Sequence, residues 1–425
     1  MKILIENILA LLPQEAKVCS VAVEDGVITA VGDRPEGFRP DKIINGSGKM
    51  LIPGLINAHT HSYMTIFRNC ADDLKFNDWL FGRILPLEDQ LTEEDCYWGS
   101  LLGIMEMLST GTTSFNDMYI FINAQARAAA ESGIRAVLSR GLTGGKDDPE
   151  GGARRLDEAE REIRAWSGRE NITFMLAPHA PYTCDEDYQR QVAEAARRLD
   201  VPIHTHISES QAEMETIREK NGCTPPELMD RTGLLTDRTV AAHCVYLTDS
   251  DIELFAQRGV SVATNPVSNL KLANGVAPIP KMLRAGVNVA MGTDGTASNN
   301  TLNMVGELKL LSILHKGITG DPQAISAREG FQIATINGAK ALCLKNVGAI
   351  AAGMKADLAI LSLDTPNVSP LGDPYSALAY SFSGLETETV MVGGKILMEN
   401  REFLTIDAER VLFEVGRVIE RIGLK

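Results

Sequence analysis

The feature that most constrains the fold of this chain is a regular alternation along its middle part. Short runs rich in β-branched and small apolar residues end near positions 60, 117, 140, 178, 206, 244, 264 and 294. Helix-like stretches separate most of them, for example residues 93–110 and 148–166. Eight strands separated by helices over about 250 residues match the size of a (β/α)8 TIM barrel. A doubly wound α/β sheet is the alternative, but no Gly-rich dinucleotide fingerprint follows the first strand.

Both ends of the chain carry a different pattern, in which apolar and polar residues alternate. Residues 3–12 and 18–33 are typical of short antiparallel strands, and Asp25 begins an Asp-Gly hairpin turn. Residues 356–364 and 389–400 repeat the pattern near the other end, the latter with a Gly-Gly turn between two strands. The two ends therefore look like parts of one small β domain that the middle of the chain interrupts.

The predicted fold class is α/β, a (β/α)8 TIM barrel with a small β-sandwich domain built from both chain termini. We expect the composite β-sandwich domain to comprise residues 1–53 and 346–425, and the barrel to span residues 54–345. After the eighth strand, two further helices, at about 302–316 and 322–344, are expected to lead into the C-terminal strands.

Charge and cysteine content exclude several classes of protein. The net charge of -15 and a sequence pI near 5.0 argue against a nucleic-acid or anionic-membrane surface, because either needs a basic patch. The seven cysteines are scattered and form no C-x-x-C pair, which fits a reducing, cytoplasmic setting. The apolar N-terminal segment contains Glu6 and is too short to span a bilayer, so we interpret it as the first strand.

The placement of the histidines is the most informative polar feature. Six of the seven fall at the C-terminal ends of the predicted strands, and only His315 lies elsewhere, inside a helix-like stretch. Because the C-terminal ends of barrel strands form one rim, these side chains should meet there. The rim residues are His59 and His61 on the first strand, His179 on the fourth, His204 and His206 on the fifth, His243 on the sixth and Asp294 on the eighth.

The spacing of His59 and His61 predicts a metal site. Residues two apart on a strand point to the same face, so both imidazoles can bind one ion. His206 and Asp294 are placed to complete the shell, and four nitrogen and oxygen ligands with an open position are typical of catalytic zinc. Such an ion lowers the pKa of a water ligand to about 7, which predicts a metal-dependent hydrolase.

Each of these residues also has a purely structural interpretation. Asp294 precedes a glycine and could begin a turn, and Glu209, three residues after His206, could be an acid in the first turn of a helix. A single histidine on a strand is usually a packed side chain. Together, these interpretations require five separate coincidences at one end of consecutive strands, so we favour the metal site.

Several motifs resemble those of the amidohydrolase superfamily, in its aminohydrolase branch. They are PGLINAHTH at the first strand, HTHISES at the fifth, AHC at the sixth and GTDGTASNN at the eighth. More narrowly, the stretches FNDWLFGRILPLEDQLTEED, TSFNDMY and SNNTLNM resemble 5-methylthioadenosine/S-adenosylhomocysteine deaminases, and the resemblance covers nearly the whole chain. It implies hydrolytic deamination of the adenine amino group of 5′-modified adenosines, which gives the inosine analogue and ammonia.

The resemblance also implies the ligand set. His59, His61, His206 and Asp294 would hold one divalent metal ion per subunit, Zn2+ in the first place and Fe2+ as the alternative. Family members with two metals usually carry a bridging carboxylated lysine at the end of the fourth strand. His179 takes that place here, which implies a single ion.

Three catalytic residues are implied in the same way. Glu209 passes a proton from water to ring N1, Asp294 takes the second water proton to the departing amine, and His243 positions the attacking oxygen. Positioned acid and base groups of this kind typically contribute about 10²–10⁴-fold each.

Three further side chains resemble substrate contacts of the family, and two arginines are candidates for their chemistry. Glu88 matches the carboxylate for the ribose hydroxyls, Trp79 the apolar wall near the 5′ substituent, and His179 the residue that faces purine and sugar. Arg140 and Arg155 could bind an amino-acid carboxylate through paired hydrogen bonds. The alternatives are core packing for Trp79 and ordinary solvated positions for the two arginines.

The expected substrates are 5′-methylthioadenosine, S-adenosylhomocysteine, 5′-deoxyadenosine and adenosine. One alternative is a deaminase or chlorohydrolase of a free base, pterin or triazine, for which the ribose-binding carboxylate Glu88 would have little purpose. Another is a non-catalytic scaffold, against which the complete ligand set argues. The expected partners are a small-molecule nucleoside and, from the resemblance, further copies of the chain in a dimer or tetramer, with no nucleic acid and no membrane.

Overall fold

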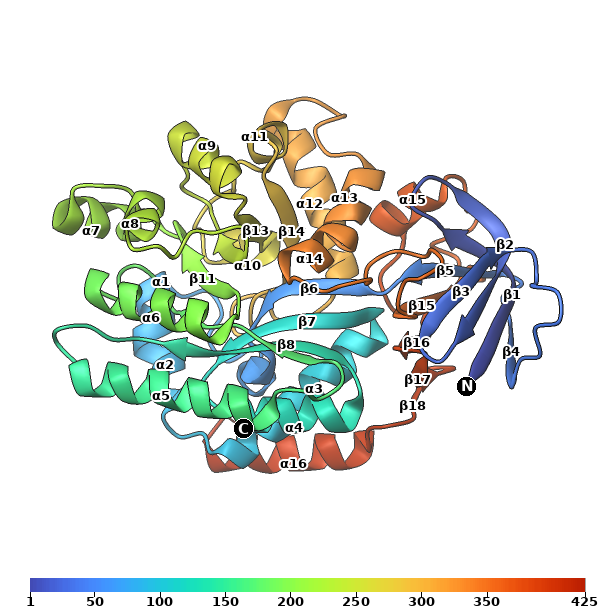
Figure 1. Cartoon of the computed structure of the whole chain (residues 1–425), viewed down its shortest axis with the longest axis horizontal. Coiled ribbons are helices and arrows are strands. Elements are labelled where there is room, and N and C mark those ends of the chain that lie inside the picture. The colour runs from blue at the N-terminus through green and yellow to red at the C-terminus, as the bar shows by residue number, and fades with distance from the viewer. Residues whose placement is uncertain (425) are drawn as a thin grey trace.

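A closed barrel of parallel strands forms the centre of the molecule. The computed structural model describes residues 1–424, the side chain of Asn77 excepted. Strands β9 and β10 share the fourth of eight strand positions, and helices cover the outside of the barrel (Figure 1), which confirms the predicted (β/α)8 fold. The barrel strands are β6 (Leu55–Thr60), β7 (Thr112–Tyr119), β8 (Arg135–Leu142), β9 (Ile172–Phe174), β10 (Ala177–Pro178), β11 (Ile203–Ile207), β12 (Thr239–His243), β13 (Ser261–Thr264) and β14 (Asn288–Met291).

Helices follow most of the strands, and short polar side chains cap their N-termini. Thr92 and Thr248 each form a capping box with the aspartate three residues later. The threonine hydroxyl accepts the backbone amide of the aspartate, and the aspartate carboxylate accepts the backbone amide of the threonine. Among residues 1–424 there is no helix long and apolar enough to cross a membrane. The helices around the barrel are α3 (Glu93–Ser109), α4 (Ile122–Ser132), α5 (Pro149–Trp166), α6 (Glu186–Leu199), α7 (Gln211–Asn221), α8 (Pro225–Arg231), α9 (Asp249–Arg258), α10 (Pro266–Lys271), α11 (Ile279–Arg284) and α12 (Met304–Thr319).

One helix predicted from the sequence is two helices in the structure. In place of a continuous helix at 322–344, α13 (Ala327–Ile333) and α14 (Ile336–Ala341) are separated at Thr335, whose φ of -130° and ψ of -95° are not helical. The break redirects the chain so that α14 packs against β6 and β14. Apolar periodicity does not reveal such a turn, because both halves bury one face.

Strands from both ends of the chain build one nine-stranded sheet, at the right in Figure 1. Its order is β18-β17-β16-β15-β5-β1-β2-β3, with β4 beside β1, so β5 and β15 join the two ends as antiparallel neighbours. This confirms the composite β domain predicted from the termini. Its strands are β1 (Lys2–Leu11), β2 (Ala16–Glu24), β3 (Val27–Gly32), β4 (Lys42–Asn45), β5 (Lys49–Pro53), β15 (Leu358–Ser362), β16 (Thr387–Val392), β17 (Lys395–Glu399) and β18 (Glu402–Phe403).

The two predicted hairpin turns of this domain are present and touch each other. Asp25 and Gly26 have φ of 48° and 84°, and Gly393 and Gly394 have φ of 53° and 74°, as a type I′ turn requires. A methyl group on Gly26 would lie 2.6 Å from the carbonyl oxygen of Gly393. Glycine is therefore needed at Gly26 for two reasons, the left-handed conformation and the close approach of the second turn.

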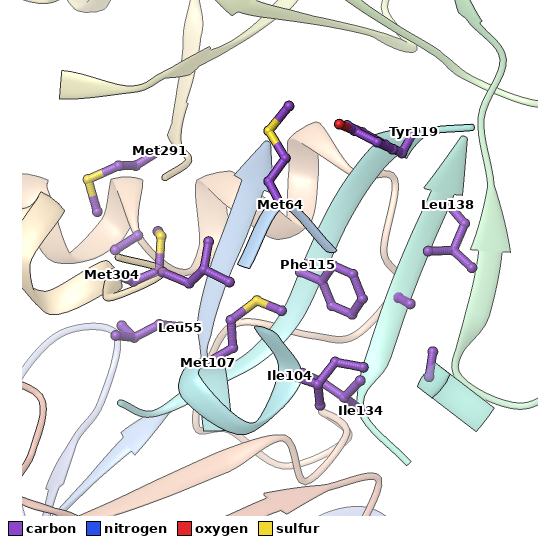
Figure 2. Close-up of a cluster of buried hydrophobic side chains, with 14 of the residues drawn as sticks. Leu55, Met64, Ile104, Met107, Phe115, Tyr119, Ile134, Leu138, Met291 and Met304 are labelled. Carbon is purple, nitrogen blue, oxygen red and sulfur yellow. The ribbon is translucent and has the colours of Figure 1, made fainter. Parts of the chain in front are cut away.

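The larger apolar core contains most of the barrel's buried side chains and also part of the β domain, for example Met50 and Ile52 of β5. Figure 2 shows part of the larger one, where Phe115 of β7 lies toward Ile104 and Met107 of α3. A second cluster, which includes Ile5 and Leu358, lies within the β domain. The β domain thus has a small core of its own and also packs against the barrel, and the domain boundaries at 53/54 and 345/346 stay a prediction.

The last helix, α16 (Ala408–Arg421), returns from the β domain to the outside of the barrel (Figure 1). It packs against α3, and Arg421 at its end forms an ion pair with Asp95. The remaining short helices are η1 (Ser62–Phe67), α1 (Phe76–Trp79), η2 (Leu80–Ile84) and α2 (Leu85–Glu88) between β6 and α3, and α15 (Pro374–Ser376) and η3 (Ala377–Ser381) between β15 and β16.

A buried ion pair joins the barrel to the β domain. Arg135, at the start of β8, donates to the Asp357 carboxylate through Nε at 2.6 Å and through an Nη at 3.0 Å. The two side chains are 4% and 1% exposed. Asp357 also accepts the amide of Gly393 at 2.7 Å, so one carboxylate ties β8 to the turn between β16 and β17.

Replacing Asp357 by Ala should lower the free energy of unfolding by about 3–5 kcal/mol, because the Arg135 charge would stay buried without its partner. Denaturant unfolding followed by circular dichroism measures the loss. The control is Lys281→Ala, which removes an exposed ion pair with Asp249 and should cost less than about 1 kcal/mol. A loss at Asp357 no larger than at Lys281 would contradict the structural role of the buried pair.

Candidate metal centre

Five of the predicted rim residues meet at the C-terminal mouth of the barrel. The ring centres of His61 and His206 each lie 4.9 Å from that of His59. The ligand atoms of His59, His61 and Asp294 lie within 4.8 Å of one another, as do those of His59, His206 and His243. Strands β6, β11 and β12 and the turn after β14 therefore place four imidazoles and one carboxylate around a single point.

The spacing of the donor atoms fits one metal ion. Asp294 Oδ1 lies 3.2 Å from His61 Nε2 and 3.4 Å from His59 Nε2, and the Nε2 atoms of His61 and His206 are 3.4 Å apart. Ligand atoms about 2.0–2.2 Å from a tetrahedral ion are about 3.3–3.6 Å from one another. His59 Nε2 is buried and has no hydrogen-bond partner among the described residues, as expected for a nitrogen that binds a metal.

The other ring nitrogen of each histidine is anchored. His61 Nδ1 donates to the carbonyl of Met118 at 2.6 Å, and His206 Nδ1 donates to the carbonyl of His179 at 2.8 Å. His59 Nδ1 lies 2.8 Å from Nε2 of His204, a second imidazole that is fully buried behind it. Because these contacts fix Nδ1, they leave Nε2 free for a metal and set the orientation of each ring.

Burial and neighbouring groups set the charges of the ligand atoms. Burial lowers the pKa of His59 to about 3, so its ring is neutral, as a metal ligand must be. Burial alone would raise the pKa of Asp294, but the close contacts of its carboxylate with the rings of His59 and His61 hold that pKa well below its usual value. The hydroxyls of Ser268 and Ser298 donate to Asp294 Oδ2 at 2.6 and 2.9 Å, which leaves Oδ1 facing the histidines.

Glu209 and His243 lie beside the ligand set, and both line the cavity that opens over it. Glu209 precedes the N-cap of α7, so it is not an acid of the first helical turn. Its carboxylate accepts from Asn274 at 3.1 Å and lies 4.0 Å from His243 Nε2. His243 Nδ1 donates to Asn269 at 2.8 Å, so its Nε2 is directed toward Glu209.

A cavity of about 440 Å³ opens over the candidate metal ligands. Each of the five side chains predicted to contact substrate lines it. The sequence placed them on separate elements, and the structure brings them to one wall around the metal site. They are Trp79 at the end of α1, Glu88 at the end of α2, Arg140 on β8, Arg155 on α5 and His179 after β10.

The three contacts nearest the histidines differ in their own partners. The Glu88 carboxyl group makes no hydrogen bond or ion pair with the part of the chain that the structure describes, and burial raises its pKa to about 8. Trp79 is buried and donates through Nε1 to the carbonyl of Ala297 at 3.1 Å, which fixes its ring in the cavity wall. Burial lowers the pKa of His179 to about 4, so it faces the cavity as a neutral imidazole.

The two arginines line the cavity and are already paired with acids. Arg140 donates to Glu158 at 2.6 Å and to the carbonyl of Ile120, and its side chain is 11% exposed. Arg155 donates to the carbonyl of Thr143 at 2.8 Å and forms an ion pair with Asp148. Neither guanidinium is a freely solvated surface group, and both keep further N–H donors.

Several residues of the cavity were not found by sequence reasoning. An apolar wall is formed by Phe76, Leu80, Phe81, Leu85, Met118 and Tyr119. The polar supports Ser268, Asn269 and Asn274 follow β13, where the sequence had no histidine to draw attention to a strand end. The only signal was their position in the loop after the seventh strand, which in a barrel faces the active site.

A parallel barrel with histidines and a carboxylate gathered at its C-terminal rim defines the class of metal-dependent barrel hydrolases. The chain belongs to the amidohydrolase family, whose model matches residues 50–397. The 5-methylthioadenosine/S-adenosylhomocysteine deaminase of Caldanaerobacter subterraneus subsp. tengcongensis is 45% identical over 423 residues, 98% of each chain. The protein of the same name from Dictyoglomus thermophilum is 45% identical over 419 residues, again 98% of each. The resemblance stated from the motifs is confirmed.

Solved structures agree with this assignment. An adenosine deaminase from Xanthomonas campestris with bound zinc superimposes with a TM-score of 0.96 at 34% identity, covering 100% of this chain and 99% of that one. Atrazine chlorohydrolase from Arthrobacter aurescens, in complex with zinc, gives a TM-score of 0.92 at 26% identity over 98% and 100% of the two chains. Together with the donor geometry, these neighbours support a divalent metal, with zinc favoured.

Replacing His204 by Phe should weaken zinc binding by about 10–100-fold, because His59 loses the partner that orients its ring. Chelator competition measures the affinity. His204→Gln, whose amide can still accept near the position of Nε2, should be affected less. His315→Gln, at a buried histidine on α12, is the control and should leave zinc affinity unchanged. Equal affinity in His204→Phe and the wild type would contradict this role.

Proposed function

We propose that this chain hydrolyses the adenine amino group of 5′-modified adenosines, giving the inosine analogue and ammonia. The observation that carries the proposal is the pairing of Glu209 and His243 beside the ligand set, in a cavity that also contains the unpaired carboxylate of Glu88. A metal site alone would support many hydrolyses. An acid/base pair next to it, with a carboxylate placed for hydroxyl groups, favours a nucleoside.

The proposed ligands are His59, His61, His206 and Asp294, which bind one zinc ion per subunit, with ferrous iron as the alternative. Imidazole and carboxylate groups bind both metals, and none of the four proposed ligands is a thiolate. His179 follows the fourth strand position, where family members with two metals carry a bridging lysine. Its neutral imidazole cannot bridge a second ion in the way a carboxylated lysine does.

The bound ion would supply a water whose pKa is lowered to about 7. Glu209 would take one proton of the attacking water and deliver it to ring N1, and His243 Nε2 would hold the attacking oxygen near C6. Asp294 takes the second proton and passes it to the amino group, which leaves as ammonia when the C6–N bond breaks. The water oxygen stays on C6, so the balance is one water consumed and one ammonia released.

The remaining wall of the cavity would bind the sugar and the 5′ substituent. Glu88 accepts hydrogen bonds from the ribose hydroxyls, and His179 faces the purine and sugar. Trp79 and its apolar neighbours contact a 5′-thioether. Arg140 and Arg155 would bind the carboxylate of a homocysteine tail through N–H donors not used by Glu158 and Asp148.

A second candidate is a deaminase or chlorohydrolase of a free base, pterin or triazine. The likeness to atrazine chlorohydrolase favours it, because such a protein shares the fold over nearly the whole chain. Glu88 argues against it, because its half-buried carboxyl group has no hydrogen-bond partner among the described residues and a ligand with hydroxyl groups would supply one.

Two further properties belong to the same proposal. A cytoplasmic location fits the cysteines, because all seven are free thiols. A homo-oligomer, dimer or tetramer, rests on the family resemblance.

The purified protein should release ammonia from 5′-methylthioadenosine and S-adenosylhomocysteine. Removing the metal with a chelator should abolish turnover, and added zinc should restore it. A substrate with the homocysteine tail should gain about 10-fold or more in kcat/KM over adenosine, from charge-assisted hydrogen bonds to the arginines. Full activity of the metal-free protein, or turnover of free bases alone, would overturn the proposal.

Replacing Glu88 by Ala should lower kcat/KM for nucleosides by about 10–150-fold, the equivalent of one charged hydrogen bond of about 1.5–3 kcal/mol. Activity on a free base, if measurable, should not change. Asp89→Asn, at the exposed neighbouring position, is the matched control. Unaltered nucleoside kinetics in Glu88→Ala would favour the free-base alternative.

A further inference from the structure

Glu213 lies behind Glu209 and outside the cavity wall. It belongs to the first turn of α7, and its side chain is 3% exposed. One carboxylate oxygen accepts the backbone N–H of Ser208 at 2.8 Å, and the other accepts the backbone N–H of Glu209 at 2.9 Å. Both hydrogen bonds therefore go to the short turn after β11, formed by Ser208 and the proposed proton carrier Glu209.

That segment has a conformation that needs support. Ser208 has a φ of 52°, in the left-handed region, which costs a residue other than glycine roughly 1–2 kcal/mol. Its own hydroxyl makes no hydrogen bond with residues 1–424. The turn is instead held by Glu213 and by the carbonyl of Ser208, which accepts the amide of Tyr246 at 2.9 Å.

These bonds differ from ordinary helix capping. In the capping box of α3, the carboxylate of Asp95 accepts the amide of the N-cap residue, Thr92. Glu213 is the equivalent residue of α7, yet its hydrogen bonds at 2.8 and 2.9 Å go to the two residues before the N-cap Ser210. Its hydrogen bonds therefore stabilise the Ser208–Glu209 turn more than the helix.

We propose that Glu213 is a positioning residue, which fixes the peptide of Glu209 so that the Glu209 carboxylate reaches the reacting atoms. The inference rests on the proposed function, because it needs Glu209 to move a proton. With the peptide fixed by Glu213 and one carboxylate oxygen fixed by Asn274, the other oxygen of Glu209 faces His243. Both oxygens of Glu213 accept from backbone N–H groups, whereas a glutamine would place an NH₂ group against one of these amides.

The test is a double-mutant cycle with the zinc-loaded protein. Glu213→Gln should lower kcat by about 10–100-fold, as expected when a catalytic group is misplaced by about 1 Å, while KM and zinc content change little. Glu209→Gln should lower kcat by about 10²–10⁴-fold. If Glu213 acts only through Glu209, then adding Glu213→Gln to Glu209→Gln should cost less than about threefold further. Glu219→Gln, an exposed acid on the same helix, is the control.

Each outcome decides between the two roles. The same loss in both backgrounds, or a loss explained by lower zinc content, would mean a general structural role and overturn the proposal. If Glu213→Gln does not fold, Glu213→Asp, which keeps a carboxylate on a shorter side chain, enters the same cycle. Failure of the proposed function would be seen separately, as a wild-type protein without turnover of any adenine nucleoside.

Discussion

The candidate site depends on the closure of the barrel between its first and last strands. The amide of Asp294 donates to the carbonyl of His59 at 3.0 Å, and the hydroxyl of Thr60 donates to the carbonyl of Asp294 at 2.9 Å. One layer below, Asn57 and Thr293 exchange two hydrogen bonds, at 2.7 and 3.0 Å. These contacts join residues more than 230 positions apart in the chain, so the hydrogen bonds that close the barrel also bring the metal ligands of its first and last strands together.

Strand periodicity explains why much of this site could be predicted from the sequence. The C-terminal ends of the strands of a parallel barrel lie at one rim, and residues two apart on a strand share a face. The sequence therefore predicts that His59 and His61 lie close to His206. The supports of the site were less predictable. Asn269 and Asn274 act through His243 and Glu209, but nothing in their local sequence says which side chain a loop residue will reach once the barrel is closed.

Tertiary neighbours also determine whether the two cavity arginines are solvated or paired with acids. From the sequence, Arg140 follows a strand and Arg155 lies in an Arg-rich helix, so solvated positions were a reasonable alternative. The structure pairs Arg140 with Glu158, within α5, and Arg155 with Asp148, the N-cap residue of the same helix. Pairing with an acid holds each guanidinium in place before a ligand binds, so less side-chain entropy is lost on binding. The same pairing leaves fewer N–H donors for the ligand.

Buried carboxylates hold the rim loops on three sides of the site. Asp117 accepts the amide of Ser62, next to His61, at 3.0 Å, and Glu307 accepts the amide of Val267, next to Ser268, at 3.2 Å. Glu213 does the same for the turn after β11. A loop amide cannot use the strand ladder, so a buried acceptor from a neighbouring element must satisfy it. Each of the three acids therefore satisfies backbone amides beside residues of the ligand set or its supports.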